Sequence, residues 1–159
     1  MLKVLFVCLG NICRSPTAHG VFESMVESRG LSDQVSIDSC GTGGWHVGES
    51  PDKRATAHAR RRGYELSHLR ARQIQPRDFY EFDYILAMDE ANLRELDLIC
   101  PSDAKVIPQL FLSFGDPATC KGETEVPDPY YGGEQGFEHV LDLVESACEG
   151  LLEDIQMCL

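Results

Sequence analysis

The chain lacks any apolar run close to the roughly 20 residues that a helix needs to cross a bilayer. Its N-terminus lacks a basic segment followed by a long apolar one, so we expect no signal peptide. Its seven cysteines include no Cys-x2-Cys pair of the zinc-binding kind, and an odd number of thiols cannot all pair within one chain. These absences predict a cytoplasmic protein with reduced thiols and no membrane contact.

Positive charge is also scarce. Fourteen Lys and Arg residues stand against 26 Asp and Glu, which gives a formal net charge of −12. This balance argues against nucleic acid as a partner, because phosphate backbones repel an acidic protein. The 159 residues, 43% of them hydrophobic, suit a single globular domain over residues 1–159, which we expect to be a monomer or a weak dimer. An anionic ligand could bind such a chain only where positive potential is concentrated locally.

The first 16 residues provide such a place. The apolar run Val4–Val7 predicts a short buried strand, which leads into a turn from Cys8 to Arg14. Ser15 and Pro16 then predict the start of a helix, because Ser suits the N-cap and Pro suits the first helical position. A thiol, a loop of backbone amides, an arginine and a helix N-terminus should therefore converge on one anion site.

The chemistry of this turn follows from its residue types. Gly10 and Asn11 tolerate the positive φ angles of a curled loop, whose amides and helix dipole attract an anion. Arg14 can hold two phosphate oxygens at once. The same field lowers the pKa of a thiol from about 8.5 to roughly 3.5–7.5, so we expect Cys8 to be a nucleophilic thiolate. The Ser15 hydroxyl could either cap the helix or donate to the sulfur, and the sequence leaves both open.

Strands and helices alternate along the rest of the chain. We expect strands at 35–39, at 83–88 and within 106–114, and helices at 16–27, 52–62, 89–98 and 137–155. This alternation predicts a three-layer α/β fold, with a parallel sheet covered by helices on both faces. Ligands of such sheets bind beyond the carboxyl ends of the strands, where Cys8 and Asp89 both lie.

A second chemical feature is the segment 127–131, Pro-Asp-Pro-Tyr-Tyr. The two prolines stiffen the backbone and present Asp128 on a rigid arm. When a thiolate cleaves a phosphate ester, a protonated Asp128 could protonate the leaving oxygen and then act as a base toward water. Tyr130 and Tyr131 would form the walls of a slot for a flat aryl group. Taken alone, the segment fits an ordinary turn with surface tyrosines better than a catalytic arm.

Together the two motifs resemble those of the low-molecular-weight protein tyrosine phosphatases, whose pattern is V-C-x-G-N-I-C-R-S-P with a late D-P-Y. The resemblance continues through residues 38–39, 44–48 and 87–89. It implies a phosphotyrosine protein phosphatase I-like fold with a four-stranded parallel sheet. The implied activity is hydrolysis of phosphotyrosine in proteins, and of small aryl phosphates, through a cysteinyl-phosphate intermediate. The resemblance implies tyrosine-phosphorylated proteins as substrates and neither a metal nor an organic cofactor.

The resemblance also implies a role for each site residue. Cys8 is the nucleophile, Arg14 stabilises the transition state, and Asp128 is the general acid and base. The rest of the phosphate-binding loop is Leu9, Gly10, Asn11, Ile12, Cys13 and Ser15. The residues that support this loop are Ser39, His68 and Asp89, the last by orienting Arg14. The pocket walls are Leu9, Ile12, Trp45, Tyr130 and Tyr131. From spacing alone, Asp89 equally fits a helix N-cap, and nothing else in the sequence distinguishes His68.

Three alternative functions remain open from the sequence. Arsenate reductases share the fold and the oxyanion loop, but they need a relay of further thiols, and Cys100 and Cys120 are far apart in sequence. Phosphoarginine phosphatases tend to have Thr at the position of Ile12, whereas an apolar Ile beside paired tyrosines favours an aryl ring. A phosphotyrosine-binding module without catalysis would not need the complete set of Cys8, Arg14 and Asp128.

Two further features have both a functional and a structural interpretation. Family members often use a second thiol at the position of Cys13 to trap an oxidised nucleophile as a disulfide, although a buried thiol would also fit. The basic residues 60–62, together with Arg70 and Arg72, could attract acidic substrates, although a solvated helix face is the commoner arrangement.

Overall fold

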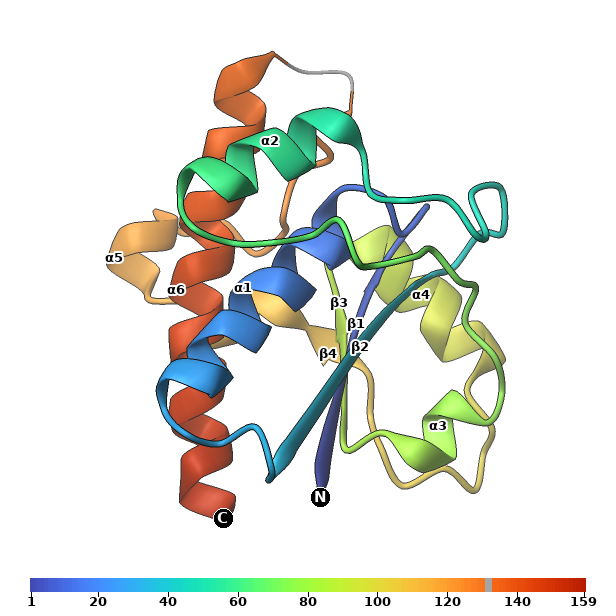
Figure 1. Ribbon diagram of the computed structural model, residues 1–159. Helices are drawn as coiled ribbons and strands as arrows, with labels where there is room; N and C mark the ends of the chain where they lie inside the picture. The colour runs from blue at the N-terminus through green and yellow to red at the C-terminus, as the bar shows by residue number, and fades with distance from the viewer. Residues whose placement is uncertain (131–132) are drawn as a thin grey trace.

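The computed structural model describes residues 1–130 and 133–159. It confirms the expected α/β fold, with a four-stranded parallel sheet between helices (Figure 1). The strands are β1 (Leu2–Cys8), β2 (Val35–Gly41), β3 (Tyr84–Ala87) and β4 (Gln109–Leu110), in the order β2-β1-β3-β4. The central position of β1 explains its uninterrupted apolar run, because both of its faces are covered.

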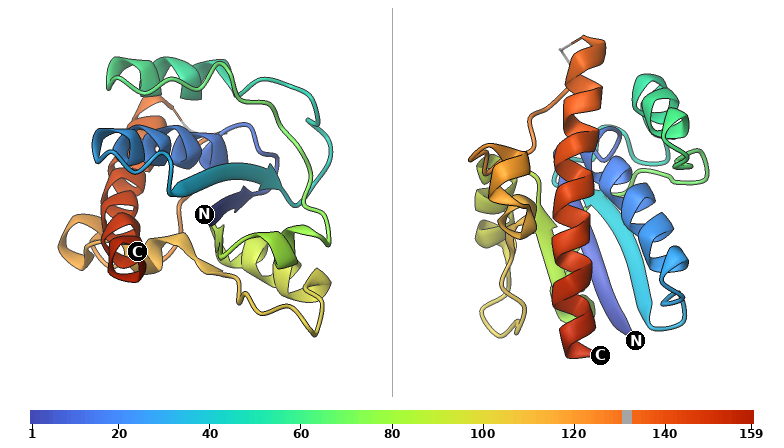
Figure 2. Two further views of the ribbon diagram at one scale, coloured as in Figure 1. Left: turned by 60° about the horizontal axis from the view of Figure 1, so that its bottom comes forward. Right: turned by 90° about the vertical axis from the view of Figure 1, so that its left-hand side faces the viewer.

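Alternate residues of β1 enter two separate hydrophobic clusters. Val4 and Phe6 pack with α1 (Arg14–Ser28) and α6 (Glu134–Cys158), and the Phe6 ring meets Phe22 edge-on at 5.8 Å between centroids. Leu5 and Val7 pack on the other face, toward α3 (Asp78–Glu81) and α4 (Glu90–Ile99). Figure 2 shows these two helical layers, with α2 (Lys53–Arg61) on the side of α1. The two clusters hold the carboxyl end of β1 in place.

The strand register places the carboxyl ends of β1, β2 and β3 side by side. Cys8 at the end of β1 pairs with Gly41 at the end of β2, and Val7 pairs with Ala87 at the end of β3. Asp89 follows β3 directly and caps α4. Cys8 and Asp89 therefore lie at the same edge of the sheet, as parallel strands require.

Several boundaries of the helices and strands differ from the expected ones. Helix α1 begins at Arg14 rather than at Pro16, and Cys13 occupies the N-cap without a side-chain hydrogen bond. Strand β4 has two residues, since the preceding Pro108 has no N–H to donate to the ladder. The additional short helices are α3, η1 (Phe111–Phe114) and α5 (Pro117–Cys120). Helix α6 begins three residues before the expected position 137 and ends at Cys158. No described helix is long and apolar enough to span a membrane.

The contact of α6 with η1 predicts a large effect of one added methyl group. A Cβ at Gly150 in α6 would lie 1.8 Å from the Phe114 carbonyl oxygen, so that one backbone must move away from the other. We expect Gly150→Ala to lower the free energy of unfolding by about 1–3 kcal/mol. Urea unfolding followed by circular dichroism measures this.

Gly136→Ala in the same helix is the matched control, because its Cβ would meet Pro129 Cβ at an ordinary 3.7 Å. Helix propensity should make this change neutral or stabilising by up to about 1 kcal/mol. Equal unfolding midpoints for the two variants would contradict the packing argument.

Candidate active site

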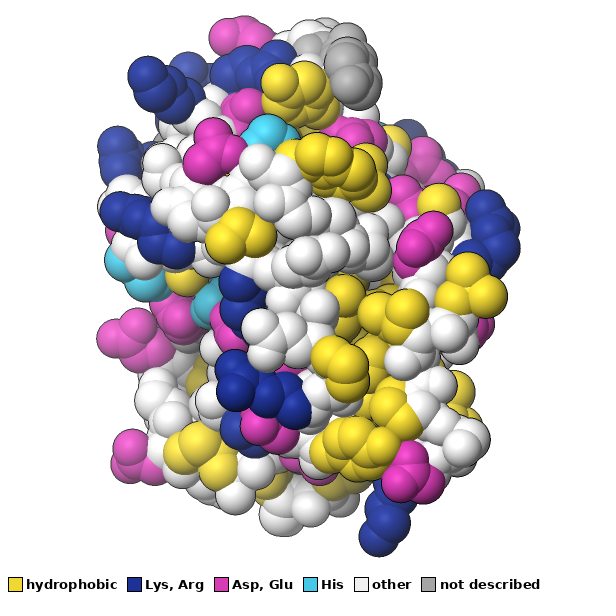
Figure 3. All heavy atoms as spheres, turned by 90° about the vertical axis from the view of Figure 1, so that its right-hand side faces the viewer, with side chains coloured by type: hydrophobic (Ala, Val, Ile, Leu, Met, Phe, Trp, Pro, Cys, Tyr) yellow, Lys and Arg dark blue, Asp and Glu magenta, His cyan; other side chains and the backbone are white. Residues whose placement is uncertain are grey.

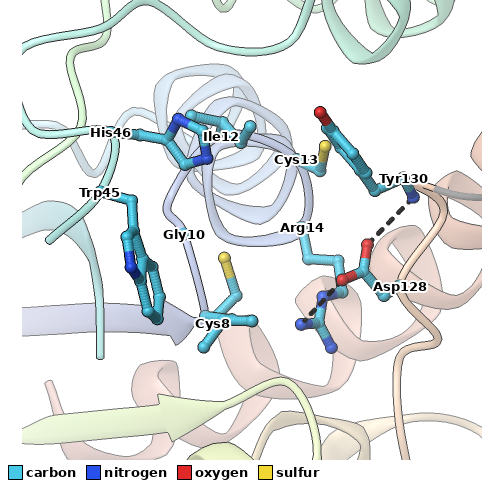
Figure 4. Close-up of a pocket in the computed structure, with 10 residues that line it drawn as sticks. Cys8, Gly10, Ile12, Cys13, Arg14, Trp45, His46, Asp128 and Tyr130 are labelled. Atoms are coloured by element: carbon cyan, nitrogen blue, oxygen red, sulfur yellow. Dashed lines mark hydrogen bonds and ion pairs between the residues drawn. The ribbon is translucent and has the colours of Figure 1, made fainter. Parts of the chain in front are cut away.

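The loop after β1 curls around the sulfur of Cys8 (Figure 4). Asn11 has a φ of 59°, in the left-handed region, and this turns its backbone N–H toward Cys8 Sγ at 3.3 Å. Gly10 packs against His46, where a Cβ would lie 3.0 Å from the ring carbon Cδ2. The Gly-Asn pair thus allows a curvature that brings an amide donor to the thiol.

Ser15 faces the sulfur rather than capping the helix. Its Oγ lies 3.0 Å from Cys8 Sγ and accepts a hydrogen bond from Asn11 Nδ2 at 2.8 Å. The orientation of that amide is fixed, since Asn11 Oδ1 accepts from the backbone N–H of Arg72 at 3.0 Å. The Ser15 proton is therefore free to be donated, to Sγ or to the Cys40 carbonyl at 3.4 Å. This arrangement stabilises negative charge on the sulfur.

Arg14 is a buried cation whose guanidinium is held by hydrogen bonds to other segments of the chain. Its NH1 donates to Asp89 Oδ2 at 2.6 Å and to the Val126 carbonyl at 3.1 Å. Burial opposes the charge of Arg14, but Cys8 and Asp89 outweigh this and raise the pKa of Arg14 above its usual value. Nε and NH2 make no hydrogen bond to another described residue, and NH2 lies 3.7 Å from Asp128 Oδ2, so this edge of the guanidinium can take a ligand.

Asp89 both orients the arginine and caps a helix. Its Oδ1 accepts from the N–H of Asn92 at 2.8 Å, while Oδ2 binds Arg14. The Asn92 side chain completes a capping box with the Asp89 N–H. The two roles that the sequence leaves open are therefore compatible, since each uses a different oxygen.

Asp128 lies across the pocket from Cys8 (Figure 4). Its segment is tied to the end of β3, because Val126 N–H donates to the Met88 carbonyl at 2.7 Å. Asp128 Oδ1 accepts from the N–H of Tyr130 at 3.0 Å, and Oδ2 lies 3.7 Å from Arg14 NH2. The carboxyl is thus aimed at the loop but keeps 38% of its side chain exposed.

A pocket of about 200 Å³ opens between these groups. Its floor is the loop, and its walls include Trp45 and Tyr130, which are 72% and 41% exposed. Arg54 holds Tyr130 from outside, with NH2 3.0 Å from the Tyr130 carbonyl and Cζ 5.4 Å from the ring centre. Leu9 and Ile12 line the pocket as expected from the resemblance, whereas Tyr131 lies outside the described residues.

Comparison with known proteins agrees with this geometry. The sequence model of the low molecular weight phosphotyrosine protein phosphatases matches residues 3–158. The chain belongs to this family. A low molecular weight protein-tyrosine-phosphatase of Streptomyces coelicolor is 46% identical, covering 97% of this chain and 93% of the relative.

Two solved structures show the same fold over almost the whole length. A protein tyrosine phosphatase from Entamoeba histolytica has a TM-score of 0.93 at 41% identity, covering 99% of this chain and 98% of that one. A Drosophila arginine phosphatase has a TM-score of 0.88 at 33% identity, covering 98% of each chain. The fold alone therefore does not choose between the two substrate classes named by these proteins.

The histidine beside Ser39 differs from the one that the family resemblance implies. Ser39 Oγ lies 3.0 Å from Nδ1 of the buried His19. His68 is about half exposed, and its Nε2 lies 3.1 Å from Glu23 Oε1, so the assignment of His68 to the loop support is corrected. Glu23 connects the two histidines, because its Oε2 lies 3.2 Å from His19 Nε2. The hydrogen bond with His19 is the main cause that holds the pKa of Glu23 below its usual value.

His46 is a pocket residue that the sequence did not single out. It lines the pocket beside Trp45, and its Nδ1 lies 2.5 Å from Glu49 Oε2. Only its position in the Gly-rich loop next to Trp45 could have pointed to it. No group of three or more His, Cys, Asp or Glu side chains among the described residues is placed to hold a metal ion.

The second thiol of the loop has a different environment from the first. Cys13 lines the pocket but is buried, and burial, followed by the charges of Asp52 and Cys8, raises the pKa of its thiol. Cys13 is therefore held protonated, whereas the donors of Asn11 and Ser15 are directed at Cys8.

Removing the charge of Asp89 tests how Arg14 is positioned. Asn can still cap α4 through its side-chain oxygen, so Asp89→Asn removes mainly the anionic partner of the guanidinium. A hydrogen bond to a charged group contributes about 1.5–3 kcal/mol, so we expect kcat/KM for p-nitrophenyl phosphate to fall roughly 10- to 100-fold.

The control is Asp116→Asn, which changes the N-cap aspartate of α5 outside the pocket. It should leave kcat/KM unchanged. Full activity of Asp89→Asn would show that Arg14 does not need this carboxylate.

Proposed function

We propose that this chain hydrolyses phosphotyrosine in proteins, and small aryl phosphates, in two steps through a phosphocysteine. The main support is the position of Cys8 Sγ within hydrogen-bond distance of the Ser15 hydroxyl and the Asn11 amide. The pocket that contains this sulfur is also lined by Arg14 and Asp128. A nucleophile, an anion cradle and a proton donor thus share one cavity with exposed aromatic walls.

In the first step the phosphate group rests on the loop amides and on the free edge of Arg14. The sulfur of Cys8 attacks phosphorus, and a P–S bond forms as the ester P–O bond breaks. Asp128, in its protonated form, gives its proton to the leaving phenolate oxygen. Arg14 stabilises the charge of the equatorial oxygens, because it is buried and already oriented by Asp89.

In the second step Asp128, now a carboxylate, removes a proton from water. The water oxygen attacks phosphorus, the P–S bond breaks, and inorganic phosphate leaves. The departing thiolate is stabilised by Ser15 and by the Asn11 N–H, at 3.0 and 3.3 Å from the sulfur. The same contacts that prepare the nucleophile therefore also improve it as a leaving group.

The walls of the pocket favour an aryl ester. Trp45 and Tyr130 offer flat faces, and Ile12 and Leu9 add apolar surface. A phosphoarginine guanidinium would need polar partners at the wall, and Ile12 offers none. Arsenate reduction is also less suited, because Cys8 and Cys13 are the only cysteines among the described residues that line the pocket.

The role of Asp128 predicts a dependence on the leaving group. A poor leaving group needs a proton as it departs, whereas a good one does not. Asp128→Ala should therefore slow phenyl phosphate by roughly 100-fold or more, and p-nitrophenyl phosphate far less, as measured by kcat/KM.

Cys8→Ser serves as the reference, since it should abolish turnover of both esters while still binding inorganic phosphate. Equal slowing of both esters by Asp128→Ala would exclude this residue as the acid. A wild-type protein that binds phosphotyrosine without turning over p-nitrophenyl phosphate would be a binding module instead.

The presence of Cys13 in the same loop predicts that Cys8 is protected against irreversible oxidation. Peroxide converts a Cys8 thiolate to a sulfenic acid. A neighbouring thiol can then react with the sulfenic acid to form a disulfide and release water. After brief peroxide treatment, we expect wild-type activity to return with dithiothreitol, and activity of Cys13→Ser not to return.

The thiolate is the attacking form, and the pKa of Cys13 is raised, so the recoverable fraction should increase with pH. Cys158→Ser, which changes an exposed thiol at the end of α6, is the control and should behave as wild type. Equal recovery of Cys13→Ser and wild type would remove this role from Cys13.

A further inference from the structure

A second groove is formed by α2 and the chain segments before and after it. It has a volume of about 420 Å³ and is lined by Lys53, Arg60 and Arg70, with hydroxyl groups of Ser50, Thr56 and Ser67. Figure 3 shows Lys and Arg side chains gathered at the upper left, the side of the molecule on which α2 lies. The catalytic mechanism makes no use of this groove.

The groove stands out because the rest of the chain is acidic. Seven of the 14 Lys and Arg residues fall between positions 53 and 72, in a protein of net charge −12. Three of these are paired with carboxylates outside the groove: Arg54 with Asp52, Arg62 with Glu138, Asp142 and Glu145, and Arg72 with Asp38 and Asp78. These ion pairs have structural roles and leave little charge for a partner.

The three cations of the groove are paired weakly or not at all. Lys53 has no carboxylate partner among the described residues, and Arg70 NH1 donates only to the carbonyls of Ser67 and Leu69. Arg60 meets Glu65 at 3.0 Å, but both side chains are more than half exposed, and such pairs contribute little. The groove therefore keeps most of its positive charge for an anionic partner.

Hydrogen bonds tie the groove to the phosphate-binding loop. Asp52, which precedes Lys53, donates its N–H to the Ile12 carbonyl at 2.8 Å. The two sides of the groove are joined by Gly48 N–H to the Ala71 carbonyl at 2.8 Å and by Ala71 N–H to the Glu49 carbonyl at 2.9 Å. The groove is therefore connected to the phosphate-binding loop through the backbone at Asp52, and an extended peptide that leaves the pocket in this direction advances about 3.3 Å per residue toward it.

We propose that this groove binds Asp or Glu side chains that flank the phosphotyrosine of protein substrates. This inference rests on the function proposed above. Arginine forks match carboxylates in two-point contacts, and the hydroxyls of Ser50 and Ser67 can add hydrogen bonds. The acidic surface elsewhere repels such segments, so that the groove also sets the direction in which the peptide lies.

The test compares two phosphotyrosine peptides that differ only in acidic or amide side chains at the flanking positions. For the wild type we expect kcat/KM to be about tenfold higher for the acidic peptide, mainly through KM, and the difference to shrink with added salt. Lys53→Gln/Arg60→Gln/Arg70→Gln should reduce the preference to below about threefold, with p-nitrophenyl phosphate hydrolysed as before.

The matched control is Arg77→Gln/Arg94→Gln/Lys105→Gln, which removes the same charge from the segments around α3 and α4. It should keep the preference. A preference that is absent in the wild type, that survives in the groove variant, or that is lost equally in the control would overturn the inference while leaving the phosphatase function intact. A short DNA strand that inhibits below the KM of the acidic peptide would also overturn it, by assigning the groove to nucleic acid.

Binding by the Cys8→Ser form separates the two proposals. Fluorescence anisotropy with the same peptides should show the same ratio of affinities, and the groove substitutions should abolish it. If the wild type hydrolysed neither ester nor peptide, the proposed function would fail, and this binding ratio would still decide the role of the groove.

Discussion

The buried charge of Arg14 is the constraint on which the rest of the site depends. A guanidinium that is 3% exposed is unfavourable unless it is paired and its donors are satisfied. Asp89 and the Val126 carbonyl meet this requirement, and they come from the chain after β3 and from the segment before Asp128. The pairing of one cation thus joins three distant segments, and it brings the thiol of Cys8 and the carboxyl of Asp128 to opposite sides of one pocket.

The distribution of positive charge follows the same logic at a larger scale. Cations that hold the fold together, such as Arg62 and Arg72, are surrounded by carboxylates. In the pocket, Arg14 keeps one edge of its guanidinium for a ligand. In the proposed groove, Lys53 has no carboxylate partner among the described residues and Arg60 has only an exposed one. A net charge of −12 therefore does not prevent the binding of an anion. It limits anion binding to places where Lys or Arg side chains have few carboxylates nearby.

Local sequence predicts those parts of the structure that local physics determines. The run of β1, the curled loop and the cap of α4 depend on residues within a few positions of each other, and each could be predicted. The contact of His19 with Ser39 and the place of His46 in the pocket could not, because they depend on how separate segments meet. The short helices α3 and α5 have too few residues for a periodic pattern. For Ser15 the sequence offered two partners, and the amide of Asn11, fixed by the distant Arg72 N–H, selects the sulfur.

The two cysteines of the loop show how far environment, rather than spacing, decides chemistry. Cys8 receives an amide and faces a hydroxyl, both of which favour a charged sulfur. Cys13, five positions later, receives no hydrogen bond to its sulfur among the described contacts, and burial together with nearby negative charge raises the pKa of its thiol. A loop that stabilised both thiolates would place two like charges at one phosphate site and repel the substrate. A neutral Cys13 therefore avoids a second negative charge at the place where the loop is proposed to hold a phosphate group.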